Sequence, residues 1–78
     1  MEKGFVIIVK DYKAEIVEFF TLKIISMPDG SRIYYVITKY GNEYFKETDL
    51  STTRESLEQE CSAMNEALGK VHGASRVY

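Results

Sequence analysis

The spacing of apolar residues changes near Asp49, and this change constrains the fold more than any other feature of the 78-residue chain. Before Asp49, β-branched and aromatic residues lie between turn motifs, a pattern typical of β-strands. After it, apolar residues recur at intervals of four and three, the spacing of one face of an α-helix. These helix residues are Leu57, Cys61, Met64, Leu68 and Val71. The sequence therefore predicts an α+β fold in which strands precede one amphipathic helix.

Two turn motifs divide the first part of the chain into strands. Met27-Pro28-Asp29-Gly30 contains a proline that presets φ and a glycine that tolerates a positive φ. Gly41-Asn42 fits a two-residue hairpin loop with glycine in its first position. We expect one domain, 1–78, built as a four-stranded antiparallel β-meander with a C-terminal helix (β-β-β-β-α). The expected strands span about 4–10, 15–27, 31–40 and 43–47, the helix 51–69, and a tail 70–78.

These loops would sort the strand side chains onto two faces, because successive side chains of a strand point to opposite sides. The expected pairs are Ile25–Ile33 and Leu22–Val36 in the first hairpin, and Thr38–Phe45 and Lys39–Tyr44 in the second. The face expected to carry the helix holds Phe20, Leu22, Ile24, Tyr34, Val36, Thr38 and Phe45. Two alternatives remain open. A β-bulge near Phe19 and Phe20 would exchange the faces of half of the second strand, and residues 14–20 also fit a helical spacing.

The second face is expected to meet solvent or a partner, because one helix covers only one face of a sheet. Its apolar residues are Ile25, Ile33, Tyr35, Ile37 and Tyr44. A contiguous apolar patch is typical of a protein interface. The sequence therefore predicts a non-enzymatic protein-binding module that forms a homodimer, binds another protein, or does both. Phage and mobile-element accessory proteins that inhibit a host factor share this size and acidic character, which is an analogy only.

Nucleic acid is the alternative partner. Lys23, Lys39 and Lys46 are expected on the same face as the tyrosines, and lysines beside aromatic rings suit single-stranded nucleic acid. The net charge of −2 and the pI near 5.3 weigh against this interpretation.

The predicted helix carries an acidic face that includes Glu55, Glu58 and Glu66. An acidic helix face is usually exposed to solvent and has no further role. The alternative hypothesis is that this face docks on a basic partner.

The residues that enzymes and metal sites need are scarce. The chain has one cysteine, Cys61, expected in the apolar stripe of the helix, and one histidine, His72, expected in the tail. No catalytic constellation or phosphate-binding motif is present, so we expect no enzyme activity, no cofactor and no metal. The longest uninterrupted apolar run is Phe5–Val9, far below the roughly 20 residues of a membrane helix. We therefore expect a cytoplasmic protein without membrane contact.

Overall fold

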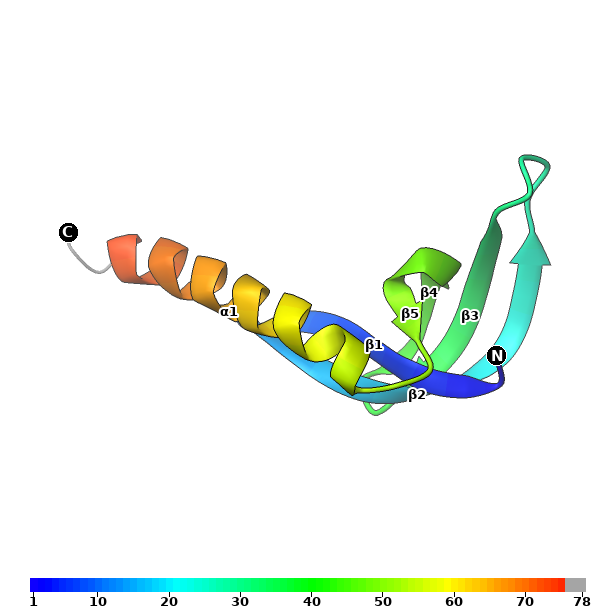
Figure 1. Ribbon diagram of the computed structural model, residues 1–78, viewed down its shortest axis with the longest axis horizontal. Helices are drawn as coiled ribbons and strands as arrows, with labels where there is room; N and C mark the ends of the chain where they lie inside the picture. Colours follow the sequence, from blue (N-terminus) through cyan, green and yellow to red (C-terminus); the bar gives the residue numbers. More distant parts are fainter. Residues whose placement is uncertain (76–78) are drawn as a thin grey trace.

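A computed structural model describes residues 1–75, with side chains as far as Lys70, and confirms the α+β class. An antiparallel sheet is followed by one C-terminal helix (Figure 1). The elements are β1 (Lys3–Lys10), β2 (Lys13–Ser26), β3 (Arg32–Thr38), β4 (Gly41–Lys46), the 3-10 helix η1 (Glu47–Asp49), β5 (Leu50–Ser51) and α1 (Glu55–Ser75). The helix starts four residues later than expected and continues into the expected tail, and the side chains of Val71 and His72 lie outside the described residues.

The two-residue strand β5 is an addition that the sequence pattern did not predict. The sheet order is β4-β3-β2-β1-β5, so η1 carries the chain from one edge of the sheet to the other. The hydroxyl of Tyr34 on β3 donates a hydrogen bond of 2.8 Å to Glu47 in η1. On the far side, β5 passes so close to Gly4 that an added Cβ would lie 2.3 Å from the carbonyl oxygen of Ser51. Glycine at this position therefore permits the crossover.

The sheet is covered on both sides along Phe5 to Ile8 of β1, whereas Val9, the last residue of the apolar run, is exposed. One face, here called the core face, carries a buried cluster of Val6, Val17, Phe19, Tyr34, Val36 and Leu50. The opposite face packs against α1 through Phe5, Ile7, Ala14 and Ile16, which meet Leu57, Cys61, Met64 and Leu68. The predicted apolar stripe of the helix is thus confirmed over its described side chains.

The predicted seat of the helix is wrong, and a β-bulge is the reason. The pair Ile25–Ile33 forms as expected, but the register shifts between Thr21 and Lys23, so Val36 pairs with Thr21 instead of Leu22. The shift moves Phe20 opposite Ile37, onto the face that carries the helix. Ile24 pairs with Tyr34 and lies on the opposite face from the helix, whereas Phe20 shares the helix-bearing face but is not covered. Phe20, Leu22 and Ile24 are all exposed.

The second hairpin also differs in register. Its loop is Lys39–Tyr40, and Gly41 follows the loop with φ +106°, so Thr38 pairs with Gly41 and Tyr35 with Tyr44. The expected pairs Thr38–Phe45 and Lys39–Tyr44 do not form. The displacement is four residues, an even number, so each side chain of β4 keeps its predicted face.

Candidate functional site

An uncovered area of nine positions, here called the open-face patch, lies on the helix-bearing face beyond the N-terminal end of α1. Strand pairing arranges it as three rows across β2, β3 and β4. The rows are Phe20–Ile37–Asn42, Lys23–Tyr35–Tyr44 and Ile25–Ile33–Lys46. The patch contains all five residues of the predicted interface, and no position in it carries a carboxylate.

Apolar and aromatic side chains occupy the middle strand of the patch and extend onto both of its outer strands. Phe20 is 53% exposed, Ile37 41% and Tyr44 58%, values that are high for residues of their size. The rings of Tyr35 and Tyr44 stack at a centroid distance of 4.5 Å with a tilt of 35°. Asn42 donates a hydrogen bond of 3.2 Å to the hydroxyl of Tyr35. These contacts hold the two rings in place, so the patch presents a pre-ordered aromatic surface.

The sequence prediction omitted Phe20 and Asn42 from this surface. Phe20 was assigned to the other face because the pairing rule assumed an unbroken second strand. The adjacent residues Phe19 and Phe20 had suggested a bulge near this point, and the bulge lies two residues further on. Asn42 was placed in a loop, whereas it lies in β4 opposite Ile37.

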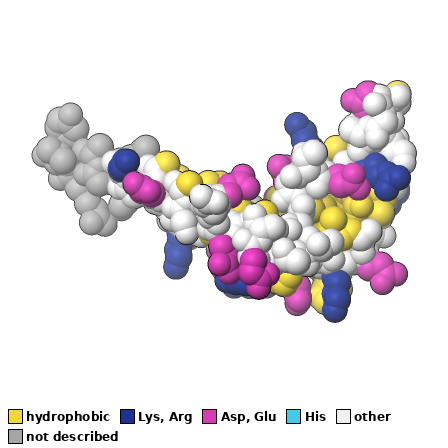
Figure 2. Space-filling model, viewed as in Figure 1, with side chains coloured by type: hydrophobic (Ala, Val, Ile, Leu, Met, Phe, Trp, Pro, Cys, Tyr) yellow, Lys and Arg dark blue, Asp and Glu magenta, His cyan; other side chains and the backbone are white. Residues whose placement is uncertain are grey.

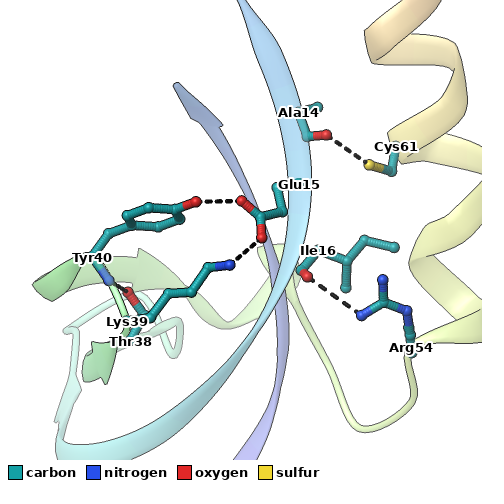
Figure 3. A network of polar contacts seen from close by, with 8 residues as sticks. All are labelled: Ala14, Glu15, Ile16, Thr38, Lys39, Tyr40, Arg54 and Cys61. Carbon is teal, nitrogen blue, oxygen red and sulfur yellow. Dashed lines mark hydrogen bonds and ion pairs between the residues drawn. The ribbon is translucent and has the colours of Figure 1, made fainter. Parts of the chain in front are cut away.

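Two of the three predicted lysines lie in the patch. Lys23 is on β2 at a point that β1 does not reach, and Lys46 is on the outermost strand β4, so the two cations flank the patch at opposite edges. Lys39 is elsewhere. Its ammonium group pairs with the carboxylate of Glu15, close to the ring of Tyr40 (Figure 3).

The group of Glu15, Lys39 and Tyr40 is an exposed charge network near the turn of the β1–β2 hairpin. The side chain of Lys39 and the hydroxyl of Tyr40 each donate a hydrogen bond to Glu15. The bond from Lys39, followed by that from Tyr40, lowers the pKa of Glu15, and the bond to Glu15 raises the pKa of Lys39. Lys10 adds a second cation 4.7 Å from the centre of the Tyr40 ring. Lys39 is thus held in an ion pair with Glu15 of the same chain and does not belong to the open-face patch.

The predicted acidic face of the helix is solvent-exposed at Glu55, Glu58 and Glu66. Glu55 and Glu58 lie in the first turn of α1, where a negative charge stabilises the helix end. Glu66 forms an exposed ion pair of 3.6 Å with Lys70. Helix stabilisation accounts for these positions, and docking of a basic partner there stays a prediction.

Cys61 lies in the core, as predicted. Its thiol is buried and donates a hydrogen bond of 3.4 Å to the carbonyl oxygen of Ala14. Within residues 1–70, no three cysteine, histidine or acidic side chains are grouped to hold a metal ion. In the same part of the chain, α1 is too polar to cross a membrane.

Comparisons of the chain with protein-family models, curated proteins and solved structures find no match. The functional argument therefore depends on the geometry of the open-face patch and of the strand edge beside it.

Proposed function

We propose that this protein is a non-enzymatic protein-binding module that uses the open-face patch as its contact surface. The observation that supports the proposal is the arrangement of the patch, with apolar and aromatic side chains in its centre and lysines at two opposite edges. Interfaces between proteins have the same anatomy, an apolar centre rich in tyrosine and a polar rim. The exposed apolar groups gain free energy when a partner removes them from water.

A second copy of the chain is the first partner to test. The two lysines lie at the rim, so two patches can meet at their apolar centres while the ammonium groups stay in water. A chain of 78 residues also has a small core, for which association is a common supplement. The proposal assigns the protein to the cytoplasm, where a thiol such as Cys61 stays reduced. A role as a phage or mobile-element accessory protein that binds a host factor would use the same patch.

The experiment is analytical ultracentrifugation of the wild type and two variants. Ile37→Glu places a charge on the middle strand of the patch. Ile24→Glu is a matched control, because Ile24 is 42% exposed against 41% for Ile37 and lies on the core face of the same hairpin. We expect the wild type and Ile24→Glu to be dimers at micromolar concentration and Ile37→Glu to be a folded monomer. A monomeric wild type, or equal dissociation of both variants, contradicts self-association through the patch.

Nucleic-acid binding is the second candidate, and one observation favours it. Lys23 and Lys46 flank the stacked pair of Tyr35 and Tyr44, and none of the nine patch positions is acidic. Bases stack on aromatic rings while lysines neutralise phosphates. Under this alternative, Lys23→Glu combined with Lys46→Glu should abolish a salt-sensitive mobility shift of a single-stranded oligonucleotide. No shift by the wild type at low salt would exclude it.

A further inference from the structure

The first half of β2 has a neighbouring strand on one side only. From Lys13 to Phe20 it pairs with β1, whereas its pairing with β3 begins at Phe20. β3 stops pairing there because the chain turns back at Lys39–Tyr40 to form β4. Among the strands of residues 1–75, none occupies the line of β3 beyond this turn. The β1–β2 hairpin therefore has an uncovered edge along β2.

The backbone groups of Ala14, Ile16 and Glu18 point toward this edge. In an antiparallel pair, alternate residues exchange hydrogen bonds with the partner strand, and the residues between them point away. The two-residue loop after Lys10 makes Lys10 and Lys13 a bonded pair, so the odd-numbered residues of β2 bond to β1. The side-chain contacts agree, because they reach the backbone of Ala14 and Ile16 and not that of Glu15 or Val17.

Side chains from the helix end of the chain cover only part of the edge. The amide of Asn65 accepts a hydrogen bond of 2.7 Å from the N–H of Ala14 and donates one of 2.9 Å to its carbonyl, which is the pair of bonds a strand would make. Arg54 donates a long bond of 3.4 Å to the carbonyl of Ile16. No described residue bonds the N–H of Ile16 or either backbone group of Glu18. Two consecutive outward-facing residues are thus open to a further strand.

A groove runs along this open edge. Its volume is about 560 Å³, and its lining includes Ile16, Glu18, Ile37 and Arg54. Figure 3 shows the side chains of Glu15, Lys39 and Tyr40 on one side of β2 and those of Arg54 and Cys61 on the other. The groove therefore has two walls with a strand edge between them, a shape that fits an extended chain.

We propose that the edge of β2 at Ile16 and Glu18 binds an extended peptide by strand addition. The peptide takes the line that β3 leaves at its turn, and it forms backbone hydrogen bonds with both residues. The groove adjoins the open-face patch, with which it shares Phe20 and Ile37, but the backbone groups that bind the peptide lie outside the patch, and the proposal does not depend on the function proposed for it.

The charges at the edge specify the side chains of the peptide. Neither Glu18 nor Arg54 has an ion-pair partner among the described residues. Directly opposed side chains of neighbouring strands interact, and opposite charges favour pairing. The peptide residue opposite Glu18 is therefore basic, and the residue opposite Ile16, beside Arg54, is acidic. The residue between them faces Val17 and is apolar. In the antiparallel orientation of β3, the order is basic, apolar, acidic.

The test is amide hydrogen exchange measured by NMR, with a six-residue peptide whose central residues are lysine, valine and glutamate. In the free protein we expect an alternation, with slow exchange at Val17 and Phe19 and fast exchange at Ile16 and Glu18. Peptide at ten times its dissociation constant should slow the exchange of the Ile16 and Glu18 amides by about tenfold. The same peptide with N-methyl groups on its pairing residues should have no effect.

A pair of variants separates strand addition from other binding. Glu18→Pro removes the outward N–H without removing a bond to β1, and it should abolish peptide binding. Glu18→Gln keeps the N–H and loses only the charge, so binding should weaken without being lost. Tyr44→Glu alters the open-face patch and should bind the peptide as the wild type does.

Three results would overturn the proposal. They are slow exchange at Ile16 and Glu18 in the free protein, no saturable change with millimolar peptide, and equal binding of the N-methylated peptide. The first two need only the wild type, so the test stands even if Glu18→Pro does not fold. None of the three bears on the sedimentation experiment, so the two proposals fail independently.

Discussion

Replacing Asn65 by alanine removes a side chain that takes the place of a strand. The amide of Asn65 forms two hydrogen bonds to the backbone of Ala14, and Ala14 is only 2% exposed. After the substitution the carbonyl of Ala14 keeps the weaker bond from the thiol of Cys61. The N–H of Ala14 has no other described partner, so the variant leaves one buried donor unpaired.

The expected loss of stability follows from these contacts. An unpaired buried donor costs about 1–3 kcal/mol. Alanine is a better helix former than asparagine, which offsets roughly half a kcal/mol. Water that enters beside Ala14 would lower the cost further, so we expect a net loss of about 1–2 kcal/mol. For a domain of this size, the midpoint of thermal unfolding should fall by roughly 5–15 °C.

The assay is urea and thermal unfolding of Asn65→Ala beside Ser62→Ala, a matched control on an exposed position of the same helix. The control should stay within about 0.5 kcal/mol of the wild type. Asn65→Asp keeps an acceptor for the N–H of Ala14, so the Ala14 amide should still exchange slowly although the variant is destabilised. If Asn65→Ala is as stable as Ser62→Ala and its Ala14 amide exchanges slowly, the side chain does not replace a strand and the reasoning is refuted.

Further predictions concern the crossover and the surface charges. Gly4→Ala would push a methyl group into the carbonyl of Ser51 and should cost about 1–3 kcal/mol in urea unfolding. Tyr34→Phe loses the bond that ties β3 to η1 and should cost about 1 kcal/mol, measured in the same way. The pKa of Glu15 is lowered mainly by the hydrogen bond from Lys39. The ion pair therefore stabilises the fold at pH values above the ordinary pKa of glutamate, and this stabilisation is lost as the pH falls through the lowered pKa of Glu15. The stability difference between wild type and Lys39→Met should therefore be constant near neutrality and shrink below about pH 4; a difference that stays constant down to pH 2 would contradict it.

Periodicity was sufficient to predict the four longer strands and the helix of this fold. The intervals of four and three identify the helix face that packs, and the motif at Met27–Gly30 locates the first hairpin loop. The register of β4 differs from the predicted one by four residues, and because four is an even number, each side chain of β4 still lies on its predicted face. The five predicted interface residues thus share one face because face assignment tolerates even shifts in register.

The seat of the helix could not be derived in this way. A single bulge at Leu22 reverses the faces of the first half of β2 relative to the second, and no residue type in this segment marks its position. The strand β5 is too short to show a pattern. Its pairing with β1 depends on a long-range contact, the close approach of Ser51 to Gly4, which local sequence does not encode.

The direction of α1 explains why the open-face patch stays uncovered. Helix and patch share one face of the sheet, so a helix running from Arg54 toward β3 would have buried the patch. The contacts show the opposite direction, because Arg54 meets Ile16 while Cys61 and Asn65 meet Ala14. The helix therefore runs toward the tip of the β1–β2 hairpin and projects past it (Figure 1).

The other face supplies no substitute cover for the β2–β3 hairpin. Leu50 and the crossover close the core face over Tyr34 and Val36, but they do not reach Leu22 and Ile24 near the hairpin end. Hydrophobic side chains are accordingly visible at this end of the molecule in Figure 2. The exposed apolar surface is thus concentrated where three strands extend beyond both the helix and the crossover. A partner that binds there needs no rearrangement of the two buried clusters, which is why a charge at Ile37 should dissociate it without unfolding the chain.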